Sequence, residues 1–416
     1  LNNNLFVLKI NFKKIIDVEY DHDFSNIYFL DYQKNKKLLL QNKLIFKKKD
    51  DKYYDYHSFN WLKVAKDIGG PRIVKITRDK ILDWTSKYNK LYLYILNSTD
   101  VSKRIINLIY HYDFYGNSAN KNDKIILKFV IFSHYSFLKK YLSTKIKNSQ
   151  KLIEVKKAIL LYEAIHKLNT KKIINQISKD INQNIDTSGL HFSMSPQIHT
   201  EYINHLIEIK NIILYFKIPL SKELEFQIIN MISVLKNFVH KDSSLAYFNG
   251  SNNFYKKNIL KIIEYEKDIK IKNLKNKING LAIFENKEIK IIFDIVIPNN
   301  KLITYGLHAS TLSFELSFNK EKIITNCGSF INKNKEAPEY LRYSAAHSTI
   351  ILNNTNISEL VKKQSYKRIP KKVEFEFNEN EYELSWKAGH DGYVPNFKKI
   401  VKRQLTINKK NNIITG

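Results

Sequence analysis

Two pairs of histidine and tyrosine residues have the side chains that proton-transfer chemistry requires. His191 lies just before a predicted helix that contains Tyr202, and His390 and Tyr393 lie together in Gly389-His390-Asp391-Gly392-Tyr393. Imidazole and phenol groups act as general base and general acid when their surroundings bring the pKa close to neutral. We therefore predict His191, Tyr202, His390 and Tyr393 as candidate catalytic residues.

Each pair also has a purely structural interpretation. His191 can simply hydrogen-bond the backbone of its loop, and Tyr202 is equally well explained as a tyrosine of the core or of a groove wall. The Asp391-Gly392 step is a common hairpin signal, which would make the second segment a plain turn. Against this, Asp391 beside His390 can supply an orienting carboxylate to a base.

The helix after His191 is predicted to begin at Pro196. Ser195 precedes it as a capping residue, and proline is tolerated at the first helical position, where its missing N–H costs nothing. Residues four apart share a helix face, so His199 lies on the face of Ser195. We predict His199 as a substrate-binding residue. Tyr202 need not lie on the same face of the helix.

Further candidates for substrate binding come from a loop and from two arginines. Tyr247 and Asn249 follow a long predicted helix and can stack on a ligand and hydrogen-bond it, although Asn249-Gly250 is equally good turn chemistry. Arg342 and Arg403 can bind a carboxylate, although an isolated arginine in a β-sandwich is more often a structural ion-pair partner.

Two kinds of periodicity divide the chain and indicate which elements position these residues. From about residue 58 to residue 264, apolar residues recur every three or four positions, which predicts repeated helix pairs and hence an α/α array or toroid. Beyond about residue 276, alternating runs predict strands of an antiparallel sandwich. We predict a multidomain α+β chain: an uncertain segment over 1–57, a helical domain over 58–270 and a β-sandwich over 276–416.

Composition limits the class of protein. The chain has 416 residues, of which 43% are hydrophobic, so it is long enough for two domains and too polar for an integral membrane protein. It contains no apolar run of the roughly 18 residues that span a membrane. The net charge of +29 favours anionic substrates. The lysines are scattered rather than clustered, however, which indicates compositional drift more than selection for a polyanionic partner.

The single cysteine and the two chain ends carry less information. Cys327 alone excludes an internal disulfide. The chain begins at Leu1 instead of methionine and stops directly after a strand-like run, so we expect a fragment at both ends. A missing signal peptide therefore says nothing about export.

The most specific pattern lies between Tyr305 and Leu352. It contains His308-Ala309-Ser310-Thr311-Leu312-Ser313-Phe314, then Asn326-Cys327-Gly328, then Ala346-His347-Ser348-Thr349. In this order these elements resemble the carboxy-terminal domain of the heparinase II/III family of polysaccharide lyases. Ser188–Pro196 and Gly389–Tyr393 add to the resemblance. It implies an incomplete α/α toroid followed by an antiparallel β-sandwich.

The resemblance also implies a reaction. Members of the family cleave uronate-containing glycans by β-elimination in the cleft between the helical and β domains. A base removes the proton alpha to the carboxylate, and the 4-linked glycosidic oxygen leaves. On this basis His191 neutralises the carboxylate or acts as the base, an acidic polysaccharide is the partner, and no cofactor is required. A periplasmic or cell-envelope location is implied, with a cytoplasmic one left open, as is the oligomeric state.

This sequence departs from the family pattern at three positions, one in the helix after Pro196 and two in the sandwich. Ile198 stands where relatives commonly have a tyrosine, Gly306 occupies the position of the first sandwich histidine, and Ser310 replaces an aspartate. These changes favour an alternative, a noncatalytic glycan-binding or cell-envelope assembly protein that keeps the lyase architecture. The scattered lysines give little support to a third class, a basic nucleic-acid-binding protein.

A zinc site in the sandwich is the remaining possibility that the resemblance raises. His308, Cys327 and His347 are its candidate ligands, because matching positions of zinc-bearing relatives hold histidine, aspartate and histidine. Asn326 is a poor replacement for the carboxylate. Cys327 reaches the site only through a strand irregularity, since adjacent strand residues point to opposite faces. The alternative is a hydrogen-bonded histidine pair.

Overall fold

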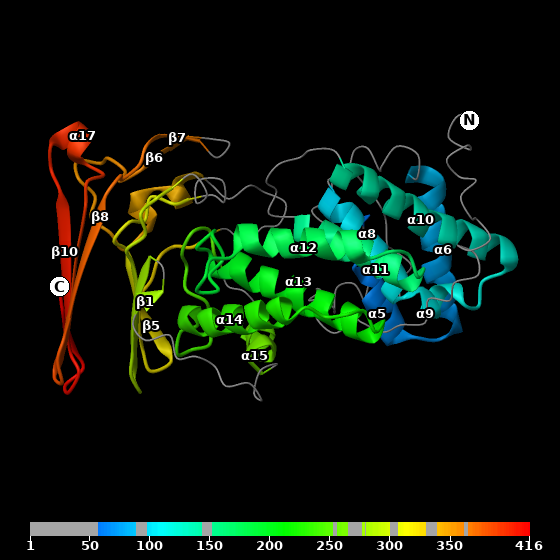
Figure 1. The fold of residues 1–416 in the computed structure, drawn as a ribbon, viewed down its shortest axis with the longest axis horizontal. Helices are drawn as coiled ribbons and strands as arrows, with labels where there is room; N and C mark the ends of the chain where they lie inside the picture. Colours follow the sequence, from blue (N-terminus) through cyan, green and yellow to red (C-terminus); the bar gives the residue numbers. More distant parts are fainter. Residues whose placement is uncertain are drawn as a thin grey trace. The chain divides into compact units, whose positions relative to one another are not determined.

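A computed structural model gives the fold of the chain (Figure 1). The structure describes residues 57–88, 98–143, 152–252, 256–264, 277–278, 280–299, 307–329, 339–361 and 365–416. Helices occupy the first part and antiparallel sheets the second, which confirms the predicted fold class. Apart from His57, the predicted amino-terminal segment lies outside the described residues, and so does Gly306.

The elements have the following bounds. The helices are α5 (Trp61–Ile68), α6 (Pro71–Tyr88), α8 (Ser98–Tyr110), α9 (Tyr112–Gly116), α10 (Lys121–Ser143), α11 (Leu152–Ile165), α12 (Lys171–Asn184), α13 (Pro196–Tyr215), α14 (Lys222–Phe238), α15 (Lys256–Glu264) and the short α17 (Val394–Phe397). The strands are β1 (Lys277–Ile278), β2 (Leu281–Glu285), β3 (Ile289–Asp294), β4 (Phe314–Phe318), β5 (Glu321–Ile324), β6 (Glu359–Val361), β7 (Ser365–Arg368), β8 (Val373–Glu379), β9 (Glu383–His390), β10 (Val401–Asn408) and β11 (Ile413–Thr415).

The chain divides into two compact units. The first comprises Leu1–Asp180 and His205–Leu220, and the second comprises Ile181–Asn204 and Ser221–Gly416. The second unit therefore contains the sheets together with the end of α12, the start of α13, and α14 and α15. No helix in the described ranges combines the length and the apolar character that a membrane span needs.

A helix buried on all sides forms the centre of the first unit. Every residue of α11 from Ile153 to Ile165 is buried, as expected of a helix that has neighbours all around it. Its two buried lysines are neutralised by carboxylates from other helices. Lys156 Nζ lies 2.8 Å from Asp180 Oδ1, and Lys157 Nζ lies 2.5 Å from Glu208 Oε2. Pairing of this kind offsets the cost of desolvating the charges.

A second set of buried polar contacts in the first unit is centred on Arg104. Its guanidinium lies over the Trp84 ring at 4.4 Å, and its Nη1 is 3.0 Å from His134 Nε2. Its Nε donates to the His57 carbonyl, and the indole of Trp84 donates to His57 Nδ1 at 2.9 Å. These contacts fix both histidine rings in the core beside a permanent positive charge.

Acidification is therefore expected to destabilise the first unit. Burial, with a smaller contribution from Arg104, lowers the pKa of His57 and of His134 to about 3. An unfolded histidine takes up a proton below about pH 6.5. The stability linked to each ring is thus complete above that pH, and it falls by about 1.4 kcal/mol per pH unit as the pH drops towards 3.

The His134→Gln variant tests this expectation. Urea unfolding at about pH 7 and about pH 5, followed by far-ultraviolet circular dichroism, gives the loss of stability for each protein. The variant lacks one of the two rings, so its loss between these pH values should be smaller by roughly 2 kcal/mol. Equal losses in wild type and variant would contradict the assignment.

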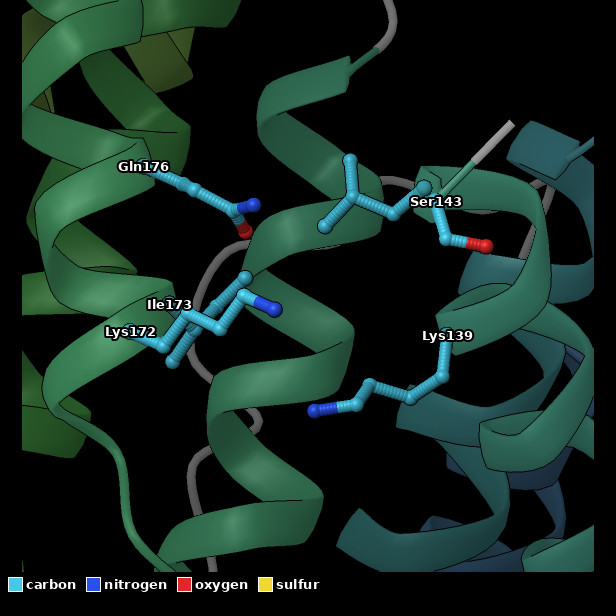
Figure 2. Close-up of a pocket in the computed structure, with 6 residues that line it drawn as sticks. Lys139, Ser143, Lys172, Ile173 and Gln176 are labelled. Carbon is cyan, nitrogen blue, oxygen red and sulfur yellow. The ribbon is translucent and has the colours of Figure 1, made fainter. Parts of the chain in front are cut away.

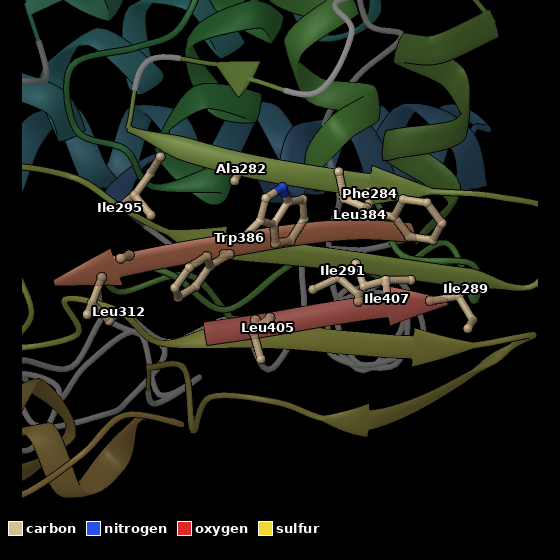
Figure 3. Close-up of a cluster of buried hydrophobic side chains, with 12 residues drawn as sticks. Ala282, Phe284, Ile289, Ile291, Ile295, Leu312, Leu384, Trp386, Leu405 and Ile407 are labelled. Atoms are coloured by element: carbon tan, nitrogen blue, oxygen red, sulfur yellow. The ribbon is translucent and has the colours of Figure 1, made fainter. Parts of the chain in front are cut away.

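The second unit is built around two facing sheets. A five-stranded sheet has the order β1-β2-β3-β4-β5, a four-stranded sheet has the order β11-β10-β9-β8, and β6 pairs with β7. Figure 3 shows the apolar side chains between the two sheets, including Ile291, Trp386, Leu405 and Ile407. The Trp386 and Phe293 rings stack with their centroids 6.1 Å apart. Alternate residues of β2, β3, β9 and β10 supply this core, as the period of two predicts.

Strand β3, in the middle of the five-stranded sheet, is buried on both faces. All six residues of β3 are buried, although only alternate ones face the sandwich core. On the other face, the Lys290 ammonium donates to the Lys236 carbonyl near the end of α14, at 2.8 Å. Helix α14 and the loop after it therefore pack on this sheet within one compact unit.

Candidate functional site

A buried carboxylate ties the loop after α14 to the five-stranded sheet. Glu315 on β4 is fully buried and accepts hydrogen bonds from His240 Nε2 at 2.8 Å, from Tyr247 N at 3.0 Å and from Asn326 N at 3.0 Å. Burial alone would raise the pKa of Glu315, but the contacts with His240, Lys322 and Asn326 hold it below its usual value. An ionised carboxylate thus fixes residues 240–247 on the sheet.

Tyr247 has a half-buried side chain beside this network. The Lys322 ammonium lies over its ring, 3.7 Å from the centroid, and donates to the Leu245 carbonyl at 2.7 Å. Burial raises the pKa of Tyr247, and the carboxylates of Glu315 and Asp242 raise it further. The phenol therefore keeps its proton at neutral pH and can donate it.

The same loop then passes close to His308. The side chain of Asn249 donates to the Met194 carbonyl and accepts from the His308 amide, both at 3.3 Å. Gly250 has φ +79°, and a Cβ built on it would lie 3.6 Å from His308 Nε2. A glycine at this position thus leaves room beside that ring nitrogen.

His308 forms a pair with His347. His308 Nδ1 lies 3.3 Å from His347 Nε2. The tautomer in which His308 Nδ1 donates to His347 Nε2 leaves His308 Nε2 unprotonated. Burial, His347 and Arg342 together lower the pKa of His308 well below its usual value. The imidazole is therefore neutral and able to accept a proton at Nε2.

Arg342 contacts the backbone on both sides of His308. Its Nε and Nη2 donate to the Leu307 carbonyl at 3.3 and 3.2 Å, and its own carbonyl accepts from Ala309 N at 2.9 Å. Within the described ranges, no carboxylate forms an ion pair with Arg342. A guanidinium has five N–H donors, so the group retains donors for an anionic ligand.

The loop that carries Tyr247 and Asn249 also caps α13. The predicted cap, Ser195, does not fill this role. Instead Ser251 Oγ accepts from Gln197 N at 3.0 Å and lies 3.1 Å from Ser195 Oγ. A serine distant in sequence thus satisfies a free amide of the first turn. This bond fixes residues 249–251 against the helix that follows His191.

The structure brings His191, His199 and Tyr202 together, but in a buried cluster. The His191 ring is 1% exposed, its Nδ1 accepts from Ser193 N at 3.1 Å, and it lies 5.0 Å from the Tyr202 ring. His199 Nε2 bonds the Met231 carbonyl at 2.7 Å. Burial lowers the pKa of His191 to about 3 and that of His199 to about 4. Both rings hold the loop to the helices.

His390 and Tyr393 also lie together, at one end of the sandwich. Gly392 N donates to His390 Nδ1 at 3.1 Å, and the fully buried Tyr393 donates its hydroxyl to the Thr355 carbonyl at 2.8 Å. Burial lowers the pKa of His390 to about 4. Asp391 does not orient the ring, because its Oδ1 accepts from the amides of residues 371 and 372. These contacts stabilise the turn.

Arg403 connects the two sheets. Its Nη1 donates to the carbonyls of Leu312 and Ser348, the latter at 2.6 Å, and its guanidinium lies 5.3 Å from the Phe314 ring. These contacts are structural, and they agree with the structural interpretation of Arg403 rather than with carboxylate binding.

The sandwich residues do not fit a zinc ion. Cys327 is exposed, and Asn326 Oδ1 accepts from Ser348 N at 3.0 Å. Across the described part of the chain, no group of three or more His, Cys, Asp or Glu side chains is arranged to hold a metal. His308 and His347 instead contact each other directly, as a hydrogen-bonded pair.

Sequence reasoning missed the network of Glu315, His240 and Lys322. The sequence held no signal for it, because the alternation Phe314-Glu315-Leu316 places Glu315 on the face opposite to the sandwich core, where a polar residue is expected to meet solvent. In the structure the loop after α14 covers that face, so the carboxylate needs a buried partner. The identity of that partner was not visible, since His240 lies 75 residues earlier in the chain.

A separate depression in the first unit shares no residue with these groups. It lies between α10 and α12 and is lined by Lys139, Leu142, Ser143, Lys172, Ile173 and Gln176. Figure 2 shows Lys139 from α10 and Lys172 from α12 extending into the same space. Lys139 is already paired with the buried Glu163 carboxylate at 2.5 Å.

Comparisons with known proteins match the β-sheet region to a family profile and the chain as a whole to solved structures of similar fold. The family profile described as Heparinase II/III-like, C-terminal, matches residues 278–416. A search of curated protein sequences gives no match.

Three solved structures illustrate the likeness in fold. A heparinase III crystal structure matches with a TM-score of 0.69 and 13% identity, covering 95% of this chain and 72% of its own. A second heparinase III gives 0.66 and 14%, covering 93% and 69%. A heparan sulfate lyase from Pedobacter heparinus gives 0.59 and 15%, covering 97% and 67%.

Proposed function

We propose that this chain, whose residues 278–416 form a heparinase II/III-like C-terminal domain, cleaves a uronate-containing polysaccharide by β-elimination. The observation that carries the proposal is that the loop with Tyr247 contacts the His308 backbone through Asn249, and that Arg342 donates to the Leu307 carbonyl beside His308. Tyr247, His308 and Arg342 supply a proton donor, a neutral imidazole and a cation with spare donors. Beta-elimination next to a carboxylate needs these three functions.

Each group has one role in the proposed reaction. Arg342 binds the uronate carboxylate and stabilises the negative charge that develops when the alpha proton leaves. His308 takes up that proton at Nε2, on the side where Gly250 has no side chain. Tyr247 donates its hydroxyl proton to the departing glycosidic oxygen. The bound carboxylate also raises the pKa of His308 towards neutral, which strengthens the base.

This assignment moves the proposed chemistry away from His191 and His390. Both rings are 1% exposed and accept a backbone amide through Nδ1, and burial keeps both neutral. His308 is also buried, at 5% exposed, but its Nε2 faces the glycine loop that carries Asn249. In the proposal, His191 and His390 hold loops in place, and Asn249 orients the His308 backbone.

The activity assay is direct. The protein is incubated with a panel of uronate polymers, including heparan sulfate, hyaluronan and alginate, and the ultraviolet absorbance of unsaturated uronate is followed. At least one polymer should give a rising signal. Absence of the signal from every polymer, with a folded protein, would overturn the proposed reaction.

A noncatalytic glycan-binding protein is the second candidate. The observation that favours it is the replacement of the family's tyrosine by Ile198, in a helix whose nearby histidines are bound internally. If the protein has this function, an acidic glycan should bind saturably and no new unsaturated ends should form. The periplasmic or cell-envelope location stays a prediction under both candidates.

A further inference from the structure

A basic depression with apolar walls lies at two neighbouring turns of the five-stranded sheet. It is lined by three lysines, one glutamate, one asparagine and two apolar side chains: Lys241, Lys287, Phe318, Asn319, Lys320, Glu321 and Ile323. None of these residues belongs to the site of Tyr247, His308 and Arg342. The depression lies entirely within the second unit.

The two turns are held together by backbone contacts. Asn319, at the β4–β5 turn, has φ 51° and donates its amide to the Glu288 carbonyl of the β2–β3 turn at 2.7 Å. Lys287 and Lys320 therefore project from adjacent, mutually fixed turns. The backbone that carries these two cations is therefore already ordered before an anionic ligand binds, which limits the freedom lost on binding.

The positive charge of the depression is not neutralised locally. Lys241 lies 2.9 Å from Glu285, but Lys290 contacts the same carboxylate at 3.0 Å, so one negative charge serves two lysines. The side chains of Lys287 and Lys320 are exposed, and Glu321 is the single acidic residue among those that line the depression. A ligand with several negative charges is therefore complementary to it.

Two exposed apolar side chains give the depression a second property. Phe318 is 40% exposed and Ile323 is 57% exposed, and both lie among the lysines. The apolar face of a sugar ring can cover such side chains, while carboxylates or sulfates on the ring reach the ammonium groups. Asn319 adds an amide that can hydrogen-bond a hydroxyl.

We infer that this depression is an accessory binding site for an acidic polysaccharide, separate from the place of reaction. The choice of a glycan over another polyanion rests on the proposed function, whereas the presence of the site rests on the lysines and the apolar side chains. An accessory site of this kind raises the local concentration of polymer without taking part in bond cleavage.

The test compares two double variants that lose the same charge. The first double variant carries Lys287→Gln and Lys320→Gln and alters the depression. Lys371→Gln with Lys399→Gln removes two exposed lysines elsewhere in the second unit. Both are made in a His308→Gln background, so that the polymer stays intact, and binding to immobilised heparan sulfate is measured over a range of salt concentrations.

The depression variant should bind heparan sulfate about tenfold more weakly at physiological salt. Its slope of log affinity against log salt should be smaller by roughly 1.5, as expected when two ammonium contacts are lost. The control variant should stay within about twofold of its parent. Adding Phe318→Ser should weaken binding further without changing the slope, because stacking releases no counterions.

Two outcomes would overturn the inference. Equal losses in the two double variants would mean that overall charge alone drives binding. Tighter binding of a single-stranded oligonucleotide, with the same dependence on Lys287 and Lys320, would assign the site to nucleic acid. Both outcomes concern binding by a protein that carries His308→Gln. They can therefore be told apart from a failure of the proposed reaction, which is measured as cleavage by the wild-type protein.

Discussion

Replacing Glu315 with leucine is expected to lower the stability of the second unit by about 3–5 kcal/mol. The carboxylate is fully buried and accepts from the His240 ring and from the amides of Tyr247 and Asn326. Leucine leaves all three donors buried without an acceptor. Hydrogen exchange measured by mass spectrometry over residues 241–252 and 314–327 reports the change, because these segments carry the affected amides.

The Glu315→Gln variant is the matched control. Its amide oxygen can still accept from both backbone amides, and its NH₂ group can donate to His240, so we expect a loss of about 1–2 kcal/mol. The contact with His240 also makes stability depend on pH. The lowered pKa of Glu315 means that its contribution is complete above the unfolded pKa of about 4.3 and is lost as the pH falls through the native pKa. A leucine variant as stable as wild type would contradict this role.

Replacing His308 with glutamine is expected to reduce kcat/KM for a uronate polymer by about 10²- to 10⁴-fold. Glutamine can still donate a hydrogen bond towards His347, but it cannot take up a proton. Initial rates of unsaturated uronate formation, with hydrogen exchange as a check of folding, measure the effect.

Two further variants separate proton transfer from structural support. Asn249→Ala keeps the imidazole and removes the acceptor for the His308 amide together with the donor to the Met194 carbonyl, so it should cost far less activity than His308→Gln. Tyr247→Phe keeps the ring under Lys322 and removes the proton donor, so it should lower kcat while leaving KM nearly unchanged. If His308→Gln retained wild-type kcat/KM, the base would have to be another residue.

The local patterns of the sequence predicted the elements well. Helix α13 begins at Pro196, and the alternation of Leu384, Trp386 and Ala388 produces a strand with one face in the sandwich core. Both features follow from short-range rules, namely the φ of proline at a helix start and the two-residue repeat of a strand.

The partners of buried polar groups could not be predicted in the same way. Ser251 caps α13 in place of Ser195, and Glu315 finds its partner in His240, because the fold brings together residues that are far apart in the chain. A repeating pattern indicates which face of an element is buried, but not what covers that face. For the same reason the sequence identified His191 as a candidate base without showing that Ser193 and Tyr202 enclose its ring.

The mass of the products is the most direct test of β-elimination by Tyr247, His308 and Arg342. A uronate polymer is digested with wild-type protein and with His308→Gln, and the new chain ends are identified by mass spectrometry. We expect unsaturated ends, formed without added water, from wild type and almost none from the variant. Hydrolytic ends from wild type, or equal amounts of unsaturated ends from both proteins, would contradict this expectation.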